Sequence, residues 1–307
     1  MKSVLGKFMK KCLFILIVFT VSTFAQSAGN SGLSFLKLGF GARNIAMGDA
    51  GSAASNDVTS LFYNPAKLSD VEGNQIMLMH NQWIQGVNSE LLGAKTNVFG
   101  IPFALGVDVT SVNDIQVRTQ ATVNPLTTFN AEYFFSSLST GFYVAKNISV
   151  GATIKYLYEG LYINESMGYG LDFGINYHSP IQGLSAVAVI RNLGTMNKLS
   201  NQSTILPTEI RFGPVYSFNF PSNKLSVNVA AEFLKYTPTN DAHINFGAEL
   251  LYDNLIALRA GYQSNYISKN FSGGFGIYWG GLTFDYAFSP YELGLGTANT
   301  ISLGIKF

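Results

Sequence analysis

The stretch HINFGAELLY, from His243 to Tyr252, sets the pattern for most of this chain. From Ile244 onward every second residue is apolar, whereas the residues between them, from His243 to Glu249, are polar or glycine. Strict alternation places the two sets on opposite faces of a β-strand. The stretch therefore predicts a strand with one apolar face and one polar face that carries few charges.

The same alternation recurs in Ile148–Tyr158, Leu225–Phe233 and Thr300–Phe307, and their polar faces hold mainly small or uncharged residues. A soluble β-sandwich with an aromatic core also alternates, but its outward polar face carries more charge. In a membrane barrel, aromatic residues gather near strand ends at the membrane interfaces. The candidates for such a girdle are Trp83, Tyr156, Tyr158, Tyr252, Tyr262, Trp279 and Tyr286.

Fourteen segments of this kind can be counted, and an even number is typical of single-chain bacterial barrels. They begin near residues 74, 88, 102, 133, 148, 169, 184, 207, 225, 242, 255, 271, 282 and 296. Short connections such as Asp253-Asn254 alternate with mostly longer ones, and the longest spans residues 114–132. Short turns belong on the periplasmic side, so we expect Phe307 there and the 114–132 connection outside. That connection is either a partner-binding loop or a mobile loop without a partner.

Composition and the first residues indicate export to a membrane. Hydrophobic residues make up 47% of the chain and charged residues only 12%, but after residue 25 no apolar run reaches the ~20 residues of a membrane helix. A basic start, the apolar run Cys12–Val21 and Thr23-Phe24-Ala25 predict a signal peptide over residues 1–25. Its removal takes away the only cysteine and lowers the net charge from +1 to −3, which argues against nucleic-acid binding.

Between the leader and the first strand, residues 41–70 are rich in Ala, Gly, Ser and Asn. Small residues allow close backbone packing, Asn56 or Asp57 can cap a short helix, and Asn64 can cap a turn that begins at Pro65. We therefore expect a plug, or hatch, inside the lumen of the barrel. The predicted division is 1–25 signal peptide, 26–72 hatch and 73–307 transmembrane β-barrel.

The stretch GARNIAMGDAGSAASNDVTSLFYNPAKL, residues 41–68, resembles the hatch of FadL-type outer-membrane proteins. It is more closely similar to the PorV/PorQ group, which is associated with the type IX secretion system of Bacteroidota. The preceding residues 33–43 of this chain, LSFLKLGFGAR, also match the stretch that usually precedes the hatch in that group. Asn56-Asp57 stands where that family has an acidic pair. The hatch-motif residues carried over are Arg43, Asp49, Asp57, Asn64, Pro65 and Ala66.

The resemblance implies a fourteen-stranded antiparallel outer-membrane β-barrel with a small N-terminal luminal hatch, in the outer membrane of a Gram-negative bacterium of the Bacteroidota. The first function that the resemblance implies is that of a component in or beside the type IX secretion system. Its partners would be secretion-system proteins or secreted cargo, besides outer-membrane lipid. The alternative is a FadL-like channel for long-chain hydrophobic molecules. Phe62, Tyr63 and Leu68 would then be candidate ligand contacts, although packing within the hatch also explains them. A structural barrel without cargo is a third possibility.

The residue pattern offers no enzyme chemistry. His80, His178 and His243 lie in separate segments, so we expect no metal site, no cofactor and no catalytic residue. A Ser-His-Asn set of Ser226, His243 and Asn228 or Asn245 is conceivable, but luminal polar packing explains it better.

Charged residues at inward positions could instead anchor the hatch, and we expect Arg43 to pair with a luminal carboxylate. The inward charges are Asp108, Lys155, Asp172, Glu209, Arg211, Glu232, Glu249, Arg259 and Asp285.

Overall fold

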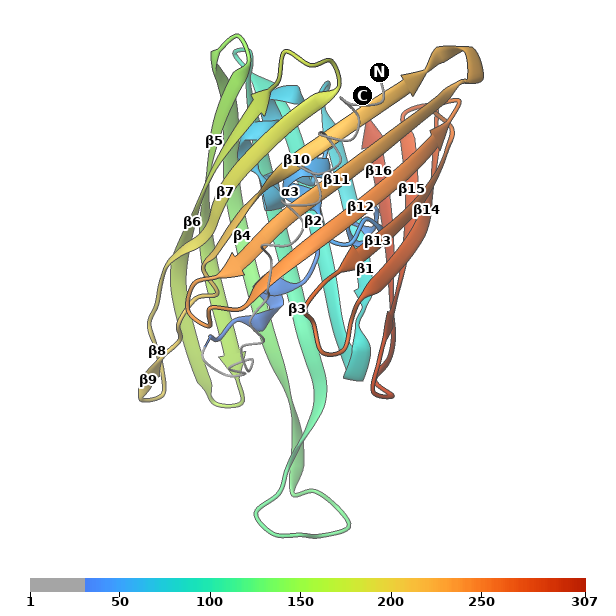
Figure 1. The fold of residues 1–307 in the computed structure, drawn as a ribbon. Coiled ribbons are helices and arrows are strands. Elements are labelled where there is room, and N and C mark those ends of the chain that lie inside the picture. Colours follow the sequence, from blue (N-terminus) through green and yellow to red (C-terminus); the bar gives the residue numbers. More distant parts are fainter. Residues whose placement is uncertain (1–30) are drawn as a thin grey trace, which may run out of the picture.

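The computed structural model describes residues 31–307, and the predicted signal peptide lies outside them. These residues form a closed barrel of fourteen antiparallel strands, β1–β7 and β10–β16, in which β1 pairs with β16 (Figure 1). The predicted fold class, a transmembrane β-barrel of fourteen strands, is confirmed. The helices of residues 31–307 are all too short to cross a membrane.

The strands follow one another around the barrel in chain order, apart from the small hairpin β8–β9. Their bounds are β1 Gln75–Gln82, β2 Val87–Val98, β3 Ile101–Val117, β4 Thr127–Ala145, β5 Ile148–Leu161, β6 Asn164–His178, β7 Leu184–Met196, β8 Lys198–Leu199, β9 Gln202–Ser203, β10 Glu209–Phe220, β11 Leu225–Tyr236, β12 Ala242–Tyr252, β13 Ile256–Gln263, β14 Phe271–Trp279, β15 Leu282–Tyr291 and β16 Gly296–Lys306. Most barrel strands begin within two residues of the predicted positions, because the turn residues that separate them are local signals.

The prediction was wrong at two of the longer connections. Strands β3 and β4 continue to pair as far as Val117 and Thr127, so the expected 114–132 loop is only 118–126. Residues Tyr162 and Ile163 alone join β5 to β6. Polar residues at these positions looked like loops, but two strands can keep their hydrogen-bond ladder in water once a neighbouring barrel sets their register. The β3–β4 hairpin consequently projects far beyond the rest of the barrel (Figure 1).

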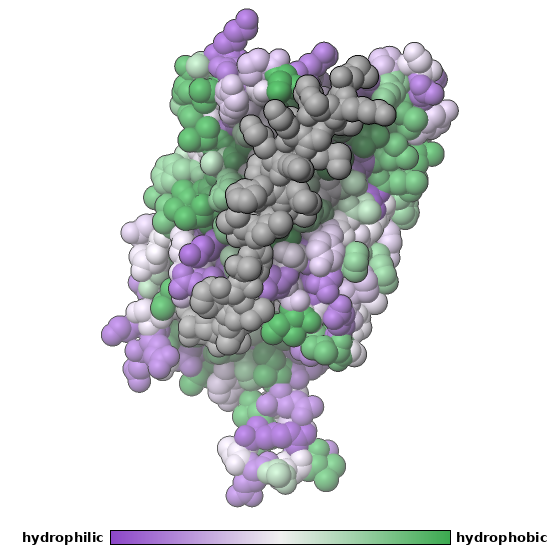
Figure 2. All heavy atoms as spheres, in the orientation of Figure 1, coloured by the Kyte–Doolittle hydropathy of each residue, from purple (hydrophilic) through white to green (hydrophobic). Residues whose placement is uncertain are grey.

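The two faces of the wall have opposite chemistry. Leu105 and Ile154 represent the outward face, where they are 59% and 56% exposed. Apolar surface gathers along the flanks of the barrel (Figure 2), as an outward face in contact with lipid requires. Trp83 departs from the predicted aromatic girdle: it is only 6% exposed, because it belongs to the turn between β1 and β2 and packs against the luminal core.

Residues 31–74, which we name the luminal segment, lie against the inner face of the barrel. The segment folds into short helical turns that contact strands around most of the wall. These turns are η1 Ser34–Lys37, α2 Ala42–Ala46, α3 Gly51–Ala54, α4 Ser60–Tyr63 and η2 Pro65–Asp70. The Asn64 side chain accepts a 3.1 Å hydrogen bond from the backbone N–H of Ala66, and Pro65 opens η2, as predicted.

Asp57 does not cap α4 directly. Its carboxylate accepts a 2.8 Å hydrogen bond from the backbone N–H of Thr59 and so shapes the turn before that helix. Local hydrogen bonding of an Asp side chain two residues ahead is an Asx turn. The Asp57 side chain therefore stabilises the turn before α4 and does not cap the helix itself.

The backbone of the luminal segment packs directly against the backbone of inward-facing glycines in the wall. A Cβ atom on Gly151 of β5 would lie 2.3 Å from the backbone of Pro65 and Ala66, and one on Gly261 of β13 would lie 1.9 Å from the nitrogen of Gly48. Gly48 itself has φ +66°, a conformation that favours glycine. Inward glycines of the strands thus make room for the segment at two separated places.

An apolar core fills the space between the luminal segment and the wall. The Phe40 and Phe62 rings stack with centroids 5.2 Å apart, and both meet Phe135 of β4 edge-on. Leu61 and Leu68 are completely buried in the same cluster. This packing closes the lumen with side chains.

Candidate functional site

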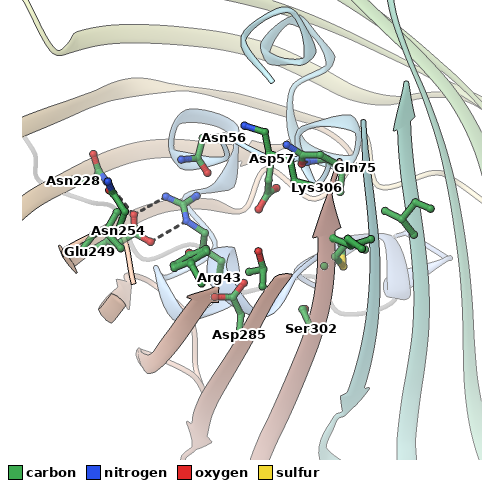
Figure 3. A pocket seen from close by; sticks show the side chains of 18 residues that line it. Arg43, Asn56, Asp57, Gln75, Asn228, Glu249, Asn254, Asp285, Ser302 and Lys306 are labelled. Atoms are coloured by element: carbon green, nitrogen blue, oxygen red, sulfur yellow. Dashed lines mark hydrogen bonds and ion pairs between the residues drawn. The ribbon is translucent and has the colours of Figure 1, made fainter. Parts of the chain in front are cut away.

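An ion-pair network ties the luminal segment to the barrel. Arg43 of α2 donates to both carboxylate oxygens of Glu249 on β12, at 2.9 and 2.7 Å. Arg259 donates to the same carboxylate at 2.7 Å and to Asp285 at 2.7 Å. The expected pairing of Arg43 with a luminal carboxylate is therefore present (Figure 3). Glu249, held by two guanidinium groups, raises the pKa of Arg43 despite the opposing cost of burial.

A second cluster surrounds Arg211 of β10. Its guanidinium contacts Glu209, Glu232 and Asp49, at 3.0 to 3.3 Å. Asp49 belongs to the luminal segment and also accepts a 2.5 Å hydrogen bond from Tyr63. Burial, and after it the neighbouring Asp49, raise the pKa of Tyr63 well above its usual range, so the phenol stays a donor. The Arg211 guanidinium therefore connects two strand carboxylates, Glu209 and Glu232, with Asp49 of the luminal segment.

All nine inward charges named from the sequence are buried, none more than 5% exposed. Sequence reasoning missed Arg191 of β7, which is 1% exposed, pairs with Glu209 at 2.5 Å and faces the Phe40 and Tyr63 rings. In the sequence, Arg191 continues the every-second-residue pattern of Val187 and Val189, and this pattern would have placed it on the inward face. Asn192, a bulge residue with φ +58°, interrupts that alternation immediately afterwards.

Lys67 of η2 is a buried cation without an ion-pair partner in the described part of the chain. Its ammonium donates to the carbonyl oxygen of Ala53 at the end of α3. Burial lowers its pKa to about 8, and the field of Asp70 opposes this shift. Lys67 therefore changes charge in mildly alkaline solution.

The barrel holds a cavity on each side of the luminal segment. The one at the short-turn end has a volume of about 420 Å³ and combines apolar side chains such as Ile76 and Leu251 with the charged groups Arg43, Asp57, Glu249 and Asp285 (Figure 3). Stripping these charged groups of water is costly, which disfavours an apolar ligand here. The predicted motif residues Arg43 and Asp57 come together here, whereas Asn64, Pro65 and Ala66 lie against β4–β6.

The cavity at the long-loop end has a volume of about 360 Å³ and walls that are richer in aromatic rings. Five of its residues carry aromatic rings: Trp83, Tyr236, His243, Tyr266 and Tyr291. The His243 and Tyr266 rings stack in parallel, with centroids 3.7 Å apart. We name this space the mouth cavity. Volumes of 300 Å³ and above, with apolar and aromatic walls, are typical of small-molecule sites.

Three polar groups in the mouth cavity are hydrogen-bond donors without a strong partner. The indole N–H of Trp83 is buried and makes no hydrogen bond with residues 31–307. The Lys37 ammonium lies 4.8 Å from the centroid of the Tyr236 ring, and that of Lys269 lies 4.7 Å from the Tyr266 ring. Burial lowers the pKa of both lysines from the usual value.

Phe62, Tyr63 and Leu68, proposed from the sequence as ligand contacts, line neither of these cavities. Each is at most 1% exposed and packs within the core. Trp83 and His243 were named from the sequence for other roles but were not connected with a cavity. The other mouth-cavity residues were missed because they come from η1 and from strand ends and loops far apart in the chain, none with a sequence motif.

The Ser-His-Asn set does not assemble. His243 lies opposite Leu234 in the ladder, and Ser226 lies opposite Leu251, eight residues further along β12. Ser226 hydrogen-bonds to Asn219 instead, at 2.8 Å. Among the described residues no group of three His, Cys, Asp or Glu side chains could hold a metal ion.

Comparison with known proteins gives the fold. No protein-family model matches the chain, and no curated protein does. The Pseudomonas putida toluene transporter TodX matches with a TM-score of 0.60 at 13% identity, over 87% of this chain and 96% of that one. The CymD monoaromatic hydrocarbon channel matches with a TM-score of 0.60 at 15% identity, over 88% and 98% of the two chains.

A Pseudomonas aeruginosa FadL homologue matches with a TM-score of 0.54 at 14% identity, over 87% of this chain and 98% of that chain. At these identities the likeness concerns architecture, and it spans nearly the whole of each protein. The chain therefore has the fold of FadL-type outer-membrane channels.

Proposed function

We propose that this protein is an outer-membrane channel that takes up small hydrophobic molecules through the mouth cavity. The observation that carries the proposal is the aromatic cavity at the long-loop end, which faces outward in barrels of this kind. The similarity in fold to hydrocarbon and toluene channels supports it.

The luminal segment would be the gate of such a channel. The apolar core around Phe40, Phe62 and Phe135 packs the segment against the wall, and a ligand taken up through the mouth cavity would pass by movement of the segment. Its attachments are ion pairs, hydrogen bonds, glycine contacts and the apolar core, none of which belongs to the strand ladder of the wall. The name hatch, taken from the resemblance, fits this role.

The two tryptophans of the chain allow a direct test of binding. Trp83 lines the mouth cavity, whereas Trp279 is 76% exposed on the outward face. In a Trp279→Phe variant all tryptophan emission comes from Trp83. Saturable quenching or a blue shift of that emission by toluene or by a longer apolar molecule is expected. Emission that stays constant across a panel of apolar molecules and their carboxylate derivatives would contradict the proposal.

A second function, docking of a secretion-system protein, is favoured by the β3–β4 hairpin. Its tip carries Val123 and Leu126, 94% and 67% exposed, far from the rest of the barrel (Figure 1). Arg118 holds the tip in shape by hydrogen bonds to Gln116 and the backbone. Apolar side chains on a structured projection suit a protein contact. Shortening the hairpin to Asn113 and Asn130 should abolish co-purification of secretion proteins and leave Trp83 quenching unchanged.

A further inference from the structure

We infer that the preferred ligand of the mouth cavity is a small aromatic carboxylate, and not a neutral hydrocarbon. The inference rests on the proposed function and deepens it by naming the ligand class. It is carried by the unpartnered donors of the cavity, by its aromatic walls and by its volume.

The first step concerns charge. Lys37 and Lys269 line one cavity from opposite parts of the chain, and neither forms an ion pair within residues 31–307. Ammonium groups taken partly out of water without an ion-pair partner are costly. An anion bound between them would remove that cost. A hydrocarbon would increase it by displacing the remaining water.

The second step concerns hydrogen bonds. The indole N–H of Trp83 has no acceptor in the described chain although the side chain is 6% exposed. Indole can only donate, and so can an ammonium group. Three donors without acceptors favour a ligand group that accepts several hydrogen bonds and carries negative charge. A carboxylate has this property, whereas a methyl or phenyl group does not.

The third step concerns the body of the ligand. The parallel His243 and Tyr266 rings and the nearby Tyr236 and Tyr291 form flat walls. Flat rings pack well against aromatic walls in offset or edge-on arrangements. A volume of about 360 Å³ lies near the lower end of the range for ligand sites. A single ring with a carboxylate fits this space better than a long flexible chain.

The remaining polar groups do not cancel the positive charge. Asp241 also lines the cavity and attracts Lys37 through space, so the lining holds two lysines and one carboxylate. Behind the lining, Glu209 attracts Lys37 and Asp49 attracts Lys269. Both of these carboxylates are already paired with Arg211. The Nδ1 atom of His243 is engaged with the backbone oxygen of Ser264 at 3.2 Å. Ser268 adds a hydroxyl group that can donate to an anion.

Benzoate and toluene provide the test, because they differ only in the carboxylate that replaces a methyl group. In the Trp279→Phe background, Trp83 emission would be titrated with each at pH 7, with hexadecanoate as a long-chain competitor. We expect benzoate to bind at least about tenfold more tightly than toluene. Lys37→Gln and Lys269→Gln should each weaken benzoate about tenfold and change toluene less than twofold.

Asp241→Asn is an independent variant that should strengthen benzoate binding several-fold, since it removes the like charge. Heat-modifiable migration on gels would show that every variant is a folded barrel. Equal or tighter binding of toluene, displacement by hexadecanoate at lower concentration than benzoate, or lysine variants without effect would each overturn the inference and leave the proposed function in place. Failure of all three ligands to alter Trp83 emission would overturn both.

Discussion

The guanidinium of Arg43 holds both oxygens of Glu249 across 206 residues of sequence, from the luminal segment to the wall. Two parallel hydrogen bonds fix direction as well as distance. Both side chains are at most 5% exposed, so the pair is shielded from salt. This contact positions α2 in the lumen.

Arg43→Ala should loosen the luminal segment. The change leaves Glu249 with Arg259 as its remaining cationic partner, and breaking a buried pair costs about 3–5 kcal/mol. Increased permeation of small sugars into proteoliposomes is the expected result. Arg118→Ala, at the exposed hairpin tip, is the matched control. Unchanged permeation in Arg43→Ala would show that the pair does not hold the segment.

Gly151→Ala should displace η2 from the wall. The added methyl group would lie 2.3 Å from backbone atoms of Pro65 and Ala66, which cannot rotate away. We expect a loss of about 1–3 kcal/mol in stability, as for other overpacked sites, together with higher sugar permeation. Gly170→Ala on the adjacent strand is the control, because its nearest neighbour would be 3.6 Å away. Similar behaviour of the two variants would contradict close docking.

Lys67 should make stability depend on pH between about 8 and 10.5. Its folded-state pKa is lowered to about 8 from 10.5, so the unfolded chain binds more protons in this window. Stability should then rise with pH, by up to about 3 kcal/mol across the window. Urea unfolding at several pH values would measure the slope, and Lys67→Met should flatten it. A slope that persists in Lys67→Met would assign it to other groups.

Leu105→Arg should impair membrane assembly. Leu105 is 59% exposed on the outward face and lies opposite Leu138 in the ladder. Arginine facing lipid near mid-membrane costs about 2–4 kcal/mol. The folded fraction after refolding into vesicles should fall, as read from heat-modifiable migration. Val123→Arg, at the hairpin tip, should refold like the parent chain. Normal refolding of Leu105→Arg would place that face away from lipid.

The strand pattern could be read directly from the sequence because alternation and turns are local properties. His243–Tyr252 alternates as written, and its inward Glu249 is buried at 3% exposure. The two misplaced strand starts, at β4 and β6, belong to hairpins whose polar residues pair outside the apolar band. Polarity alone cannot separate a water-exposed strand from a loop.

The partners of the charged residues were harder to predict from the sequence than the strands. The position of the small-residue segment inside the lumen predicts that Arg43 pairs with an inward carboxylate, but which carboxylate it meets depends on how α2 lies across β13–β16. Trp83 has the composition of an interfacial girdle residue, yet the turn after β1 directs it into the lumen. The mouth cavity gathers Lys37, Tyr236 and Lys269 from segments far apart in the chain.

The sequence by itself therefore determined the number of strands, the two faces of the wall and the small-residue segment before it. Each of these follows from period-two alternation, turn residues and side-chain size, which act between near neighbours. Only the tertiary structure decided which groups face one another in the lumen, including Arg43 with Glu249 and Lys37 with Lys269 in one cavity. Closing a barrel brings residues 200 positions apart into contact, and no local pattern encodes which atoms then meet.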